Sequence, residues 1–480
     1  MSQRLTRIHM GQARCAADLT DGSERGEYVP QDYILQKLGR PMRSVNLMYC
    51  YYPLDKGFPV RASAAFPDME VKSQWDYPYE DYFTYGGGLH GSRTSAVFQQ
   101  MEDIRRHGQD VTLTLTCDPH LPDEYLIALA QDLLPFGRVM LRLNHEATGN
   151  WFAFNRRASY EEIAAFFVHA SDVIRAYAPN VQTVICIGGI EDPDAAEMVK
   201  EKEFAKTIPA ADIWSVDKYP ALHWGWPFDT ALPGGKTHAR GSFAENYALT
   251  KASYERFRAL NGGSEKPMML GEFNADGDVT GPYDQCAMVD GFFRMRKEDE
   301  EDWLTAVNFY QFRDRGRLGL ETEDPNHPGV GIEQPVMQTF REWIADELFL
   351  PQMTECGEAS LPTTLRWGSS EDAEGLALHI LLKGDPHFCE LTFADSGSYM
   401  LELNGRWFYK SPETHFVDLM PAFYGRHISA PAEMTLKIFA PPADGRNDLE
   451  KPDGLMNSYA TVSELPSLRI EYGPVEQNCD

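Results

Sequence analysis

The chain has 480 residues, of which 43% are hydrophobic, so it can bury a large core and is globular rather than disordered. Its formal net charge is −28, and the resulting field repels phosphate backbones and anionic membrane surfaces. We therefore expect neither nucleic acid nor a membrane among its partners. An excess of acidic residues also has the simpler meaning of high solubility, and it does not by itself point to a cationic substrate.

The eight cysteines are scattered along the chain, without a C-x-x-C pair or the spacing of zinc ligands. The spacing therefore predicts neither a disulfide scaffold nor a structural metal site. No apolar stretch of signal-peptide length follows the N-terminus, and no later segment reaches membrane-spanning length. We expect a cytoplasmic protein, or a secreted one if a leader has been removed.

Up to about residue 348, short apolar runs alternate with longer amphipathic stretches, a pattern typical of β/α units around a parallel sheet. Eight strands are predicted, over 6–12, 44–51, 111–117, 139–144, 183–188, 213–217, 268–272 and 306–312. Helices are predicted over 94–107, 122–134, 160–177, 244–260, 284–297 and 334–345. The series predicts an α/β fold, a (β/α)8 TIM barrel over 1–348, with a doubly wound open sheet as the alternative.

Beyond residue 348 the pattern changes to short alternating runs separated by Gly, Pro and Asp. This predicts an antiparallel β-sandwich over 349–475, followed by a polar tail over 476–480. Trp407, Phe408 and Tyr409 fit either a module that packs against one side of the barrel or a module that binds sugar. We favour the packing module.

Two glutamates stand at the ends of predicted strands. Glu146 follows the apolar run 139–141 and has Arg142 close before it, while Glu272 ends the run 268–271. The C-terminal strand ends of a parallel barrel converge on one face, so the two acids can meet across a pocket. Retaining glycoside hydrolysis needs two carboxyls about 5–5.5 Å apart, one ionised and one protonated. The alternative for Glu146 is a salt bridge to Arg142.

The neighbours of the two acids fit different protonation states. Trp151 and Phe152 follow Glu146 closely, and desolvation together with a second carboxylate favours the protonated form of an acid. Glu272 must stay ionised, which requires hydrogen-bond donors. We expect Tyr219, His145 and Arg142 to supply them. His145 fits direct contact with the substrate and fits equally well a core histidine bonded to the backbone.

Further residues at the expected barrel face suggest contacts to sugar. Flat rings complement the C–H faces of pyranoses, and aromatic residues occur in the expected loops at Trp75, Tyr77, Tyr79, Tyr82, Trp224 and Trp226. Of all the aromatic candidates we favour Trp151 and Trp224 as contacts to substrate. Asp118 beyond the third strand, Tyr310 on the eighth, and Arg313 and Asp314 after it lie where hydroxyls could be bound. Loop packing and solvated salt bridges are the alternative roles.

The sequence does not support three other kinds of catalytic or cofactor-binding motif. The run 86–91 matches G-x-G-x-x-G but no strand precedes it, so dinucleotide binding is not predicted. Position 149 is Gly, which removes an H-E-x-x-H zinc site, and no G-x-S-x-G elbow is present. We expect no cofactor and no metal.

The segment 142–154 resembles the acid/base segment of glycoside hydrolase family 26, the β-mannanase family of the clan A barrels. The resemblance implies that Glu146 is the general acid/base and Glu272 the nucleophile, on the fourth and seventh strands. The segment 212–219 is also similar to that family, which implies that Tyr219 hydrogen-bonds the nucleophile. The chain departs from the family where tryptophans are replaced by Ala153 and Phe154, and on the eighth strand, which carries Asn308, Tyr310 and Gln311 instead of a tryptophan.

The expected activity is retaining hydrolysis of β-linked oligo- or polysaccharides resembling β-mannan, by double displacement. Within the enzyme class, the alternatives are a β-glucanase, a xylanase or a galactosidase of the same clan. A carbohydrate-binding barrel without catalysis is the alternative from another class, and the presence of both acids argues against it. No oligomeric state is predicted.

Overall fold

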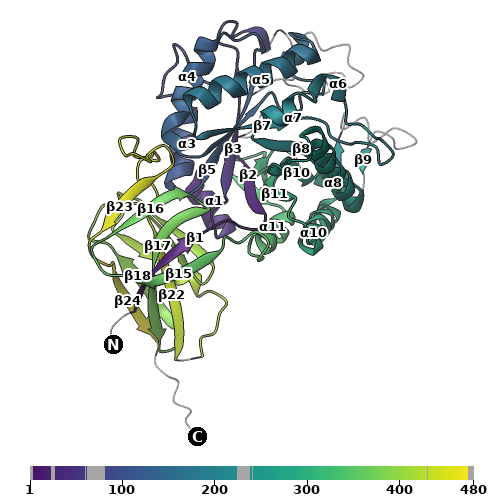
Figure 1. Cartoon of the computed structure of the whole chain (residues 1–480). Helices are drawn as coiled ribbons and strands as arrows, with labels where there is room; N and C mark the ends of the chain where they lie inside the picture. Colours follow the sequence, from purple (N-terminus) through teal and green to yellow (C-terminus); the bar gives the residue numbers. More distant parts are fainter. Residues whose placement is uncertain are drawn as a thin grey trace.

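The computed structural model describes residues 4–22, 28–59, 61, 82–223, 238–240, 242–429 and 431–473 (Figure 1). Its centre is a closed barrel in which each strand pairs in parallel with the next and the eighth returns to the first. The barrel strands are β2 (Ala16–Thr20), β3 (Ser44–Tyr51), β5 (Asp110–Cys117), β6 (Val139–Leu143), β7 (Val181–Cys186), β8 (Ile213–His223), β10 (Met268–Ala275) and β11 (Leu304–Phe309). The TIM barrel is confirmed, and the open sheet is excluded.

Helices surround this barrel, and all six that the sequence predicted are confirmed. They are α3 (Ala96–Arg106), α4 (Asp123–Leu133), α5 (Tyr160–Tyr177), α8 (Phe243–Leu260), α10 (Pro282–Glu298) and α11 (Val336–Ile344). Also present are α1 (Gln31–Leu38) and the short α6 (Glu201–Phe204), α7 (Thr207–Ala210) and α9 (Gly277–Thr280). The start of α5 is fixed by a capping box, in which Ser159 accepts from the Glu162 N–H and Glu162 accepts from the Ser159 N–H. None of the described helices is both long and apolar enough to cross a bilayer.

Alternate residues of the barrel strands face the helices and the barrel interior. In β5, Val111 and Leu113 join the main apolar core, whereas Thr112 and Thr114 hydrogen-bond to side chains of β3 inside the barrel. A small apolar cluster fills the interior near the N-terminal strand ends, made of Ala16, Met140, Val184, Ile213, Met269 and Ala306. The interior is therefore apolar near one end and polar toward the other.

The predicted first barrel strand, 6–12, is wrong. Leu5–Met10 forms β1, which pairs antiparallel with β15 (Met353–Glu358) and β17 (Asp372–Leu382) of the C-terminal sheet. Every second residue of β1 is buried, as expected for a strand with one solvated face, whereas all five residues of β2 are buried. The N-terminal strand thus belongs to the C-terminal sheet, and the predicted domain limits of 1–348 and 349–475 remain a prediction.

The C-terminal region contains two antiparallel sheets, as predicted. The larger sheet contains β15, β1, β17, β22 (Ala432–Phe439), β19 (Tyr399–Leu403) and β20 (Arg406–Lys410), with β16 (Thr363–Ser369) and β23 (Ser458–Val462) beside them. The smaller contains β21 (Phe416–Asp418), β18 (Pro386–Thr392) and β24 (Ser467–Tyr472). Leu378, Leu391 and Leu401 belong to the apolar core that joins them. The arrangement is a β-sandwich.

Short strands complete the described structure. β4 (Phe83–Thr84) pairs with β3, and β9 (His238–Arg240) pairs with β8. The segment after β11 forms a small separate sheet from β12 (Arg313–Asp314), β13 (Glu321–Glu323) and β14 (Gly331–Glu333).

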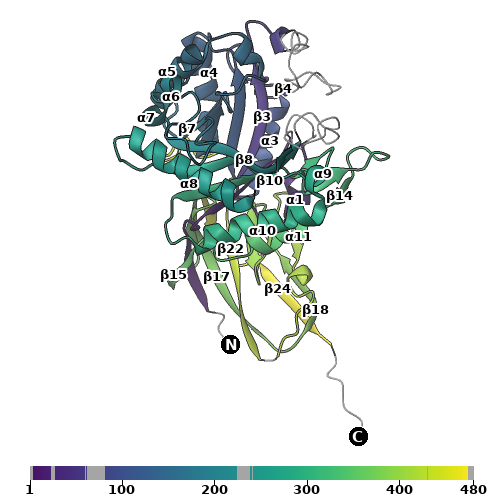
Figure 2. The same cartoon turned by 90° about the vertical axis from the view of Figure 1, so that its right-hand side faces the viewer.

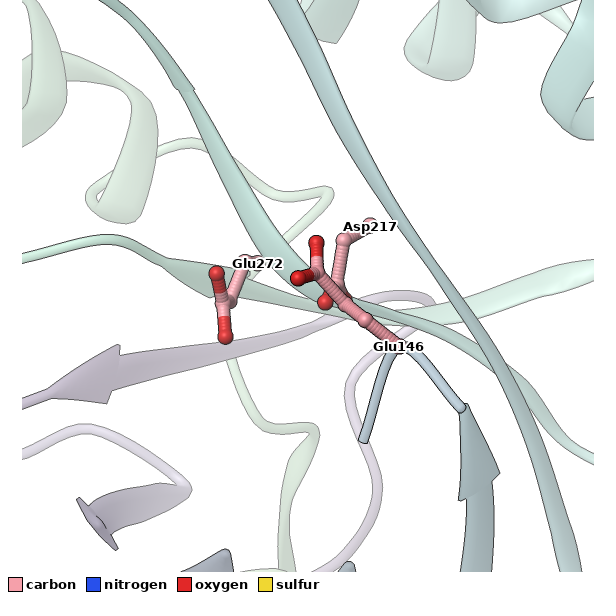
Figure 3. A group of neighbouring side chains, drawn as sticks. All are labelled: Glu146, Asp217 and Glu272. Carbon is pink, nitrogen blue, oxygen red and sulfur yellow. The ribbon is translucent and has the colours of Figure 1, made fainter. Parts of the chain in front are cut away.

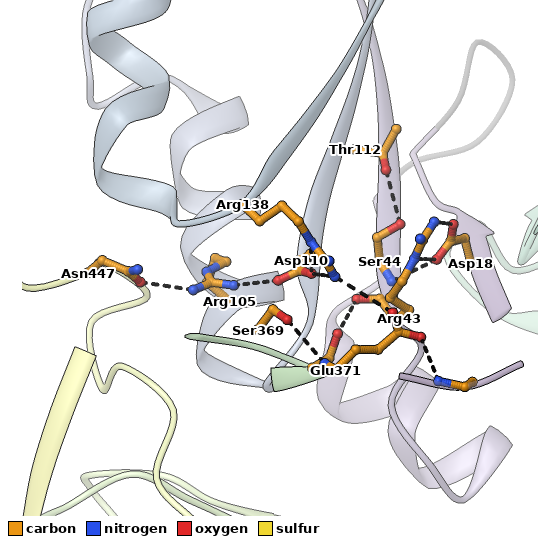
Figure 4. Close-up of polar contacts among 12 residues, drawn as sticks. Asp18, Arg43, Ser44, Arg105, Asp110, Thr112, Arg138, Ser369, Glu371 and Asn447 are labelled. Carbon is orange, nitrogen blue, oxygen red and sulfur yellow. Dashed lines mark hydrogen bonds and ion pairs between the residues drawn. The ribbon is translucent and has the colours of Figure 1, made fainter. Parts of the chain in front are cut away.

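The sandwich packs against the end of the barrel where the strands begin (Figures 1 and 2). Glu371, in the turn between β16 and β17, lies 3.9 Å from Arg138 and accepts from the Ala13 N–H (Figure 4). Arg138 in turn bonds Asp110 at the start of β5. The opposite end of the barrel, where the strands finish, is left for the site.

Aromatic residues of the sandwich line the same junction. Trp407 is buried and stacks on Phe439, with ring centroids 5.7 Å apart, and the Tyr409 ring lies 4.0 Å from that of His107 on the barrel side. Burial disfavours a charged His107, but hydrogen bonds to Asp103 and Asp32 outweigh it and raise the pKa of His107 to about 9. These contacts support the packing role expected for this module.

Candidate active site

Glu146 lies on a tight turn directly after β6. Asn144 and Glu146 both have left-handed backbone conformations, with φ of 46° and 50°. The Asn144 side chain accepts from the Cys117 N–H at 2.7 Å, and the Ala147 N–H donates to the Cys186 carbonyl at 3.2 Å. A left-handed glutamate costs about 1–3 kcal/mol and persists only where its surroundings hold it. These two hydrogen bonds, to β5 and β7, hold the turn that presents the Glu146 carboxyl.

Three carboxyl groups meet at this end of the barrel (Figure 3). Glu146 comes from the turn after β6, Asp217 from β8 and Glu272 from β10, where Glu272 pairs in register with Asp217. One oxygen of each carboxyl lies within 4.8 Å of those of the other two. The sequence predicted the meeting of Glu146 and Glu272 and missed Asp217. The sequence did contain a signal for Asp217, because Asp217 lies two residues before Tyr219 and therefore on the same face of the strand.

Arg142, on β6, forms hydrogen bonds to two of these three carboxyl groups. Its guanidinium is fully buried and donates to Glu272 Oε1 at 2.9 Å, to Asp217, and to Cys186 Sγ at 3.2 Å. Three acidic oxygens this close could share a divalent cation, but a guanidinium already bonds two of the carboxylates. The cluster is therefore built around the Arg142 charge, and the alternative pairing of Glu146 with Arg142 is not the one formed.

The three acids differ in how readily they hold a proton. Burial raises the pKa of Glu146 well above its ordinary value, and the charges of Asp217 and Glu272 raise it further. Burial also raises the pKa of Asp217 to about 7, against the opposing effect of Arg142. Glu146 is thus the group in the cluster suited to donate a proton near neutral pH.

Glu272 receives a donor on each oxygen. Tyr219 donates to Oε2 at 2.7 Å, opposite the Arg142 bond to Oε1. Burial, followed by the charge of Glu272, raises the pKa of Tyr219 well above its usual range, so the phenol keeps its proton. Two donors stabilise the ionised form of a carboxylate. The predicted contacts of Tyr219 and Arg142 to Glu272 are therefore present.

His145 was expected as a third donor, and its distance does not fit that role. Its Nε2 lies 3.7 Å from Glu272 Oε1, beyond hydrogen-bonding range, and 3.2 Å from Tyr82 Oη. Burial, followed by the charge of Arg142, lowers the pKa of His145 well below its ordinary value, so the ring is neutral. Phe152 packs against it, with ring centroids 4.5 Å apart.

Trp151 touches the candidate acid directly, and Tyr310 lies beside Tyr219. The Trp151 Nε1–H donates to Glu146 Oε2 at 2.8 Å, while the ring is only partly buried. The Tyr310 and Tyr219 rings meet edge to face at 6.2 Å. Both residues therefore lie at the cluster, and their contact with a substrate remains a prediction.

The remaining candidates for contact with a sugar either form ion pairs within the protein or lie outside the described residues. Asp118 is buried and forms an ion pair with Arg157 at 3.1 Å, so its carboxylate already has a partner. Arg313 pairs with the buried Glu321 at 2.8 Å. Trp224, Trp226, Trp75, Tyr77 and Tyr79 lie outside the described residues.

No protein-family model and no curated protein matches the chain. The solved structures that it resembles include glycoside hydrolases of families 26, 39 and 51. A modular endo-β-1,4-mannanase from Cellulomonas fimi is 12% identical, over 89% of each chain, with a TM-score of 0.43. A family 26 β-mannanase from Bacteroides ovatus is 11% identical, over 70% of this chain and 90% of its own, with a TM-score of 0.40. A family 51 α-L-arabinofuranosidase from Bifidobacterium longum is 11% identical, over 92% and 100%, with a TM-score of 0.42. Similarities this low do not bear on the substrate, so the geometry of the site has to carry the functional proposal.

Proposed function

We propose that the protein is a retaining glycoside hydrolase that cleaves β-linked oligo- or polysaccharides by double displacement. The observation that carries the proposal is the short separation of Glu146 and Glu272, within 4.8 Å between nearest oxygens. Retaining enzymes use carboxyls about 5–5.5 Å apart, whereas inverting enzymes need about 6.5–9.5 Å to admit water. The opposite surroundings of the two acids support the same assignment.

In the first step Glu272 attacks the anomeric carbon while Glu146 protonates the departing glycosidic oxygen. Arg142 and Tyr219 donate to the two oxygens of the Glu272 carboxylate and orient it for the attack. The raised pKa of Glu146 provides the proton, because burial and the neighbouring carboxylates disfavour its charged form.

In the second step Glu146 acts as a base. Formation of the glycosyl ester removes the negative charge of Glu272, which is one of the causes of the raised Glu146 pKa. Glu146, ionised once it has given up its proton, can then deprotonate the water that attacks the ester. One residue thus serves both half-reactions.

The proposed substrate is a β-mannan-like oligosaccharide or polysaccharide, on the resemblance of the segment 142–154. The tryptophans that follow in that family are replaced here by Ala153 and Phe154, which are both buried, so they offer no platform to a sugar. A substrate screen therefore has to compare aryl β-mannosides, β-glucosides, β-xylosides and β-galactosides, with the anomer of the first product measured by NMR.

The test of the mechanism uses Glu146→Ala, Glu272→Ala and, as control, Glu191→Ala in the exposed loop after β7. Glu272→Ala should be inactive, and azide should restore turnover with an α-glycosyl azide as product, since azide attacks from the vacated face. Glu146→Ala should keep activity on substrates with good leaving groups, lose about 10²–10⁴-fold on poor ones, and give a β-glycosyl azide. Wild-type behaviour of both variants, or the reverse anomers, would overturn the proposal, and a barrel that only binds carbohydrate would give no turnover with any substrate.

A further inference from the structure

A line of polar side chains crosses the barrel interior beneath the carboxyl cluster. It begins at Arg142, whose Nη1 donates to Thr114 Oγ1 in a long bond of 3.4 Å as well as to Glu272. The Thr114 hydroxyl donates to Asn46 Oδ1 at 2.8 Å, and Asn46 Nδ2 donates to Thr20 Oγ1 at 3.1 Å. These residues come from four neighbouring strands, β6, β5, β3 and β2, and all are buried.

The line continues from the other side to the backbone of β10. Asn308 on β11 donates through Nδ2 to Thr20 Oγ1 at 2.9 Å and to the Gly271 carbonyl at 2.5 Å. Gly271 immediately precedes Glu272. The hydrogen bonds therefore connect Arg142, which donates to the Glu272 side chain, with the peptide group between Gly271 and Glu272.

The donor and the acceptor of each hydrogen bond are fixed by the groups at the two ends of the line, Arg142 and the Gly271 carbonyl. A guanidinium can only donate, so the Thr114 oxygen accepts from Arg142 and its hydrogen is free for Asn46. A carbonyl can only accept, so the Asn308 amide nitrogen faces Gly271. Both halves then meet at the Thr20 oxygen, which accepts twice. A substitution that removes one member leaves a buried partner without its bond.

Gly271 adds a steric reason for the position of Arg142. A Cβ atom at residue 271 would lie 2.9 Å from Arg142 Nε, 2.7 Å from Asp217 Oδ1 and 2.5 Å from Ser215 Oγ. The guanidinium thus occupies the side of β10 from which a side chain is missing. Its position depends on the strand and on the polar line together.

We propose that Thr114, Asn46, Thr20 and Asn308 are positioning residues, which fix Arg142 relative to β10 and so hold its N–H on Glu272. This inference rests on the proposed function, since it assigns the line to the nucleophile. A donor that is already oriented before the reaction does not have to reorganise as charge leaves the carboxylate. None of the four would touch the substrate, and each would act through Arg142 or through the backbone of Glu272.

The test compares Thr114→Val with Thr112→Val, two residues earlier in β5. Thr112 is also buried and its hydroxyl pairs with Ser44 Oγ at 3.0 Å, so Thr112→Val also removes a hydroxyl bond inside the barrel. Thr114→Val removes the bond to Asn46 and the bond from Arg142. Only Thr114 is bonded to Arg142. We expect kcat/KM of Thr114→Val to fall about tenfold relative to Thr112→Val. The acid limb of its pH–rate profile should also move to higher pH, because weaker donation makes an ionised carboxylate easier to protonate.

A second pair of variants distinguishes the loss of the hydroxyl bond from a folding defect. Thr114→Ser and Thr114→Ala both remove the methyl group, and Thr114→Ala removes the hydroxyl as well, so the hydroxyl is what distinguishes the two variants. Thr114→Ser should restore both the rate and the acid limb, while Thr114→Ala should behave as Thr114→Val. Equal rates and equal acid limbs in this pair, or in the pair of valine variants, would overturn the inference. Glu272→Ala in the same assay separates the two proposals, since activity in that variant would overturn the nucleophile assignment itself.

Discussion

Asp217→Asn should lower the pH at which activity is lost on the alkaline side. Glu146 must carry a proton to release the leaving group, and the negative charge of Asp217 is one cause of its raised pKa. Burial raises the pKa of Asp217 to about 7, so its negative charge acts on Glu146 above that pH. Asparagine keeps the shape and removes the charge. The sign is therefore fixed, and Glu146 gives up its proton at lower pH in the variant.

The size of the shift follows from the separation of the two groups. The oxygens lie within 4.8 Å of each other, and two unit charges at that limit interact by about 3.5 kcal/mol at an effective dielectric constant of about 20, which corresponds to about 2.5 pH units. Arg142 bonds Asp217 and offsets part of its charge in the wild type. We therefore expect the alkaline limb to move by about 1–2.5 pH units.

The measurement is kcat/KM against pH on an aryl β-glycoside for the wild type, for Asp217→Asn and for Asp212→Asn. Asp212 directly precedes the same strand at its other end, where it accepts from the Thr183 N–H and hydroxyl, so its substitution should leave the alkaline limb in place. An alkaline limb that stays fixed in Asp217→Asn, or moves to higher pH, would refute the electrostatic reasoning.

Three further outcomes are expected. Tyr219→Phe removes the 2.7 Å bond to Glu272 and should raise the acid limb by about 1–2 pH units, read from kcat/KM against pH. His107→Gln should lower the free energy of unfolding in urea by up to about 3 kcal/mol at pH 6, because a pKa raised to about 9 gives stability that is lost as pH rises through 9. Gly271→Ala should cost most of the activity, measured as kcat, because its methyl group would meet the guanidinium that holds Glu272.

Each outcome has a matched control. Tyr247→Phe removes a tyrosine bond to Asp299 and should not move the acid limb. The His107→Gln variant and the wild type should approach equal stability at pH 10, and a difference that stays constant with pH would contradict the assigned charge. Gly384→Ala places a methyl group no closer than 3.9 Å to other atoms and should keep full activity.

Most of the barrel could be predicted because its strands are short, largely apolar and buried on both faces. Ser44–Tyr51 is buried along its whole length, and its predicted limits are those observed. The first strand was misplaced because β1 and β2 are both short and lie close together in the chain. Which of the two enters the barrel depends on pairing with residues far away in the chain, such as Met353 for β1 and Ala306 for β2. Local pattern carries no information on that pairing.

The two glutamates could be predicted because the strand ends of a barrel must converge, whatever the loops do. Asp217 shares a strand face with Tyr219, but its contact with Arg142 and its place beside Glu272 depend on residues distant in sequence, so the strand pattern alone did not give its role. The alternation of Val111 to Thr116 does indicate hydroxyls inside the barrel, but it does not say which of them reaches Arg142.

The charges of the site explain why a third acid fits it. Arg142 balances one carboxylate, so three ionised acids would leave two uncompensated negative charges in a largely buried site, which is costly. The cost is avoided when protons stay on Glu146 and, below about pH 7, on Asp217. Asp217 thus increases the tendency of Glu146 to hold its proton, while it bonds Arg142 through a different guanidinium nitrogen from the one that donates to Glu272. On this reasoning the reactivity of Glu146 is set by burial and, in addition, by an acid that the proposed mechanism never brings into contact with the reacting bond.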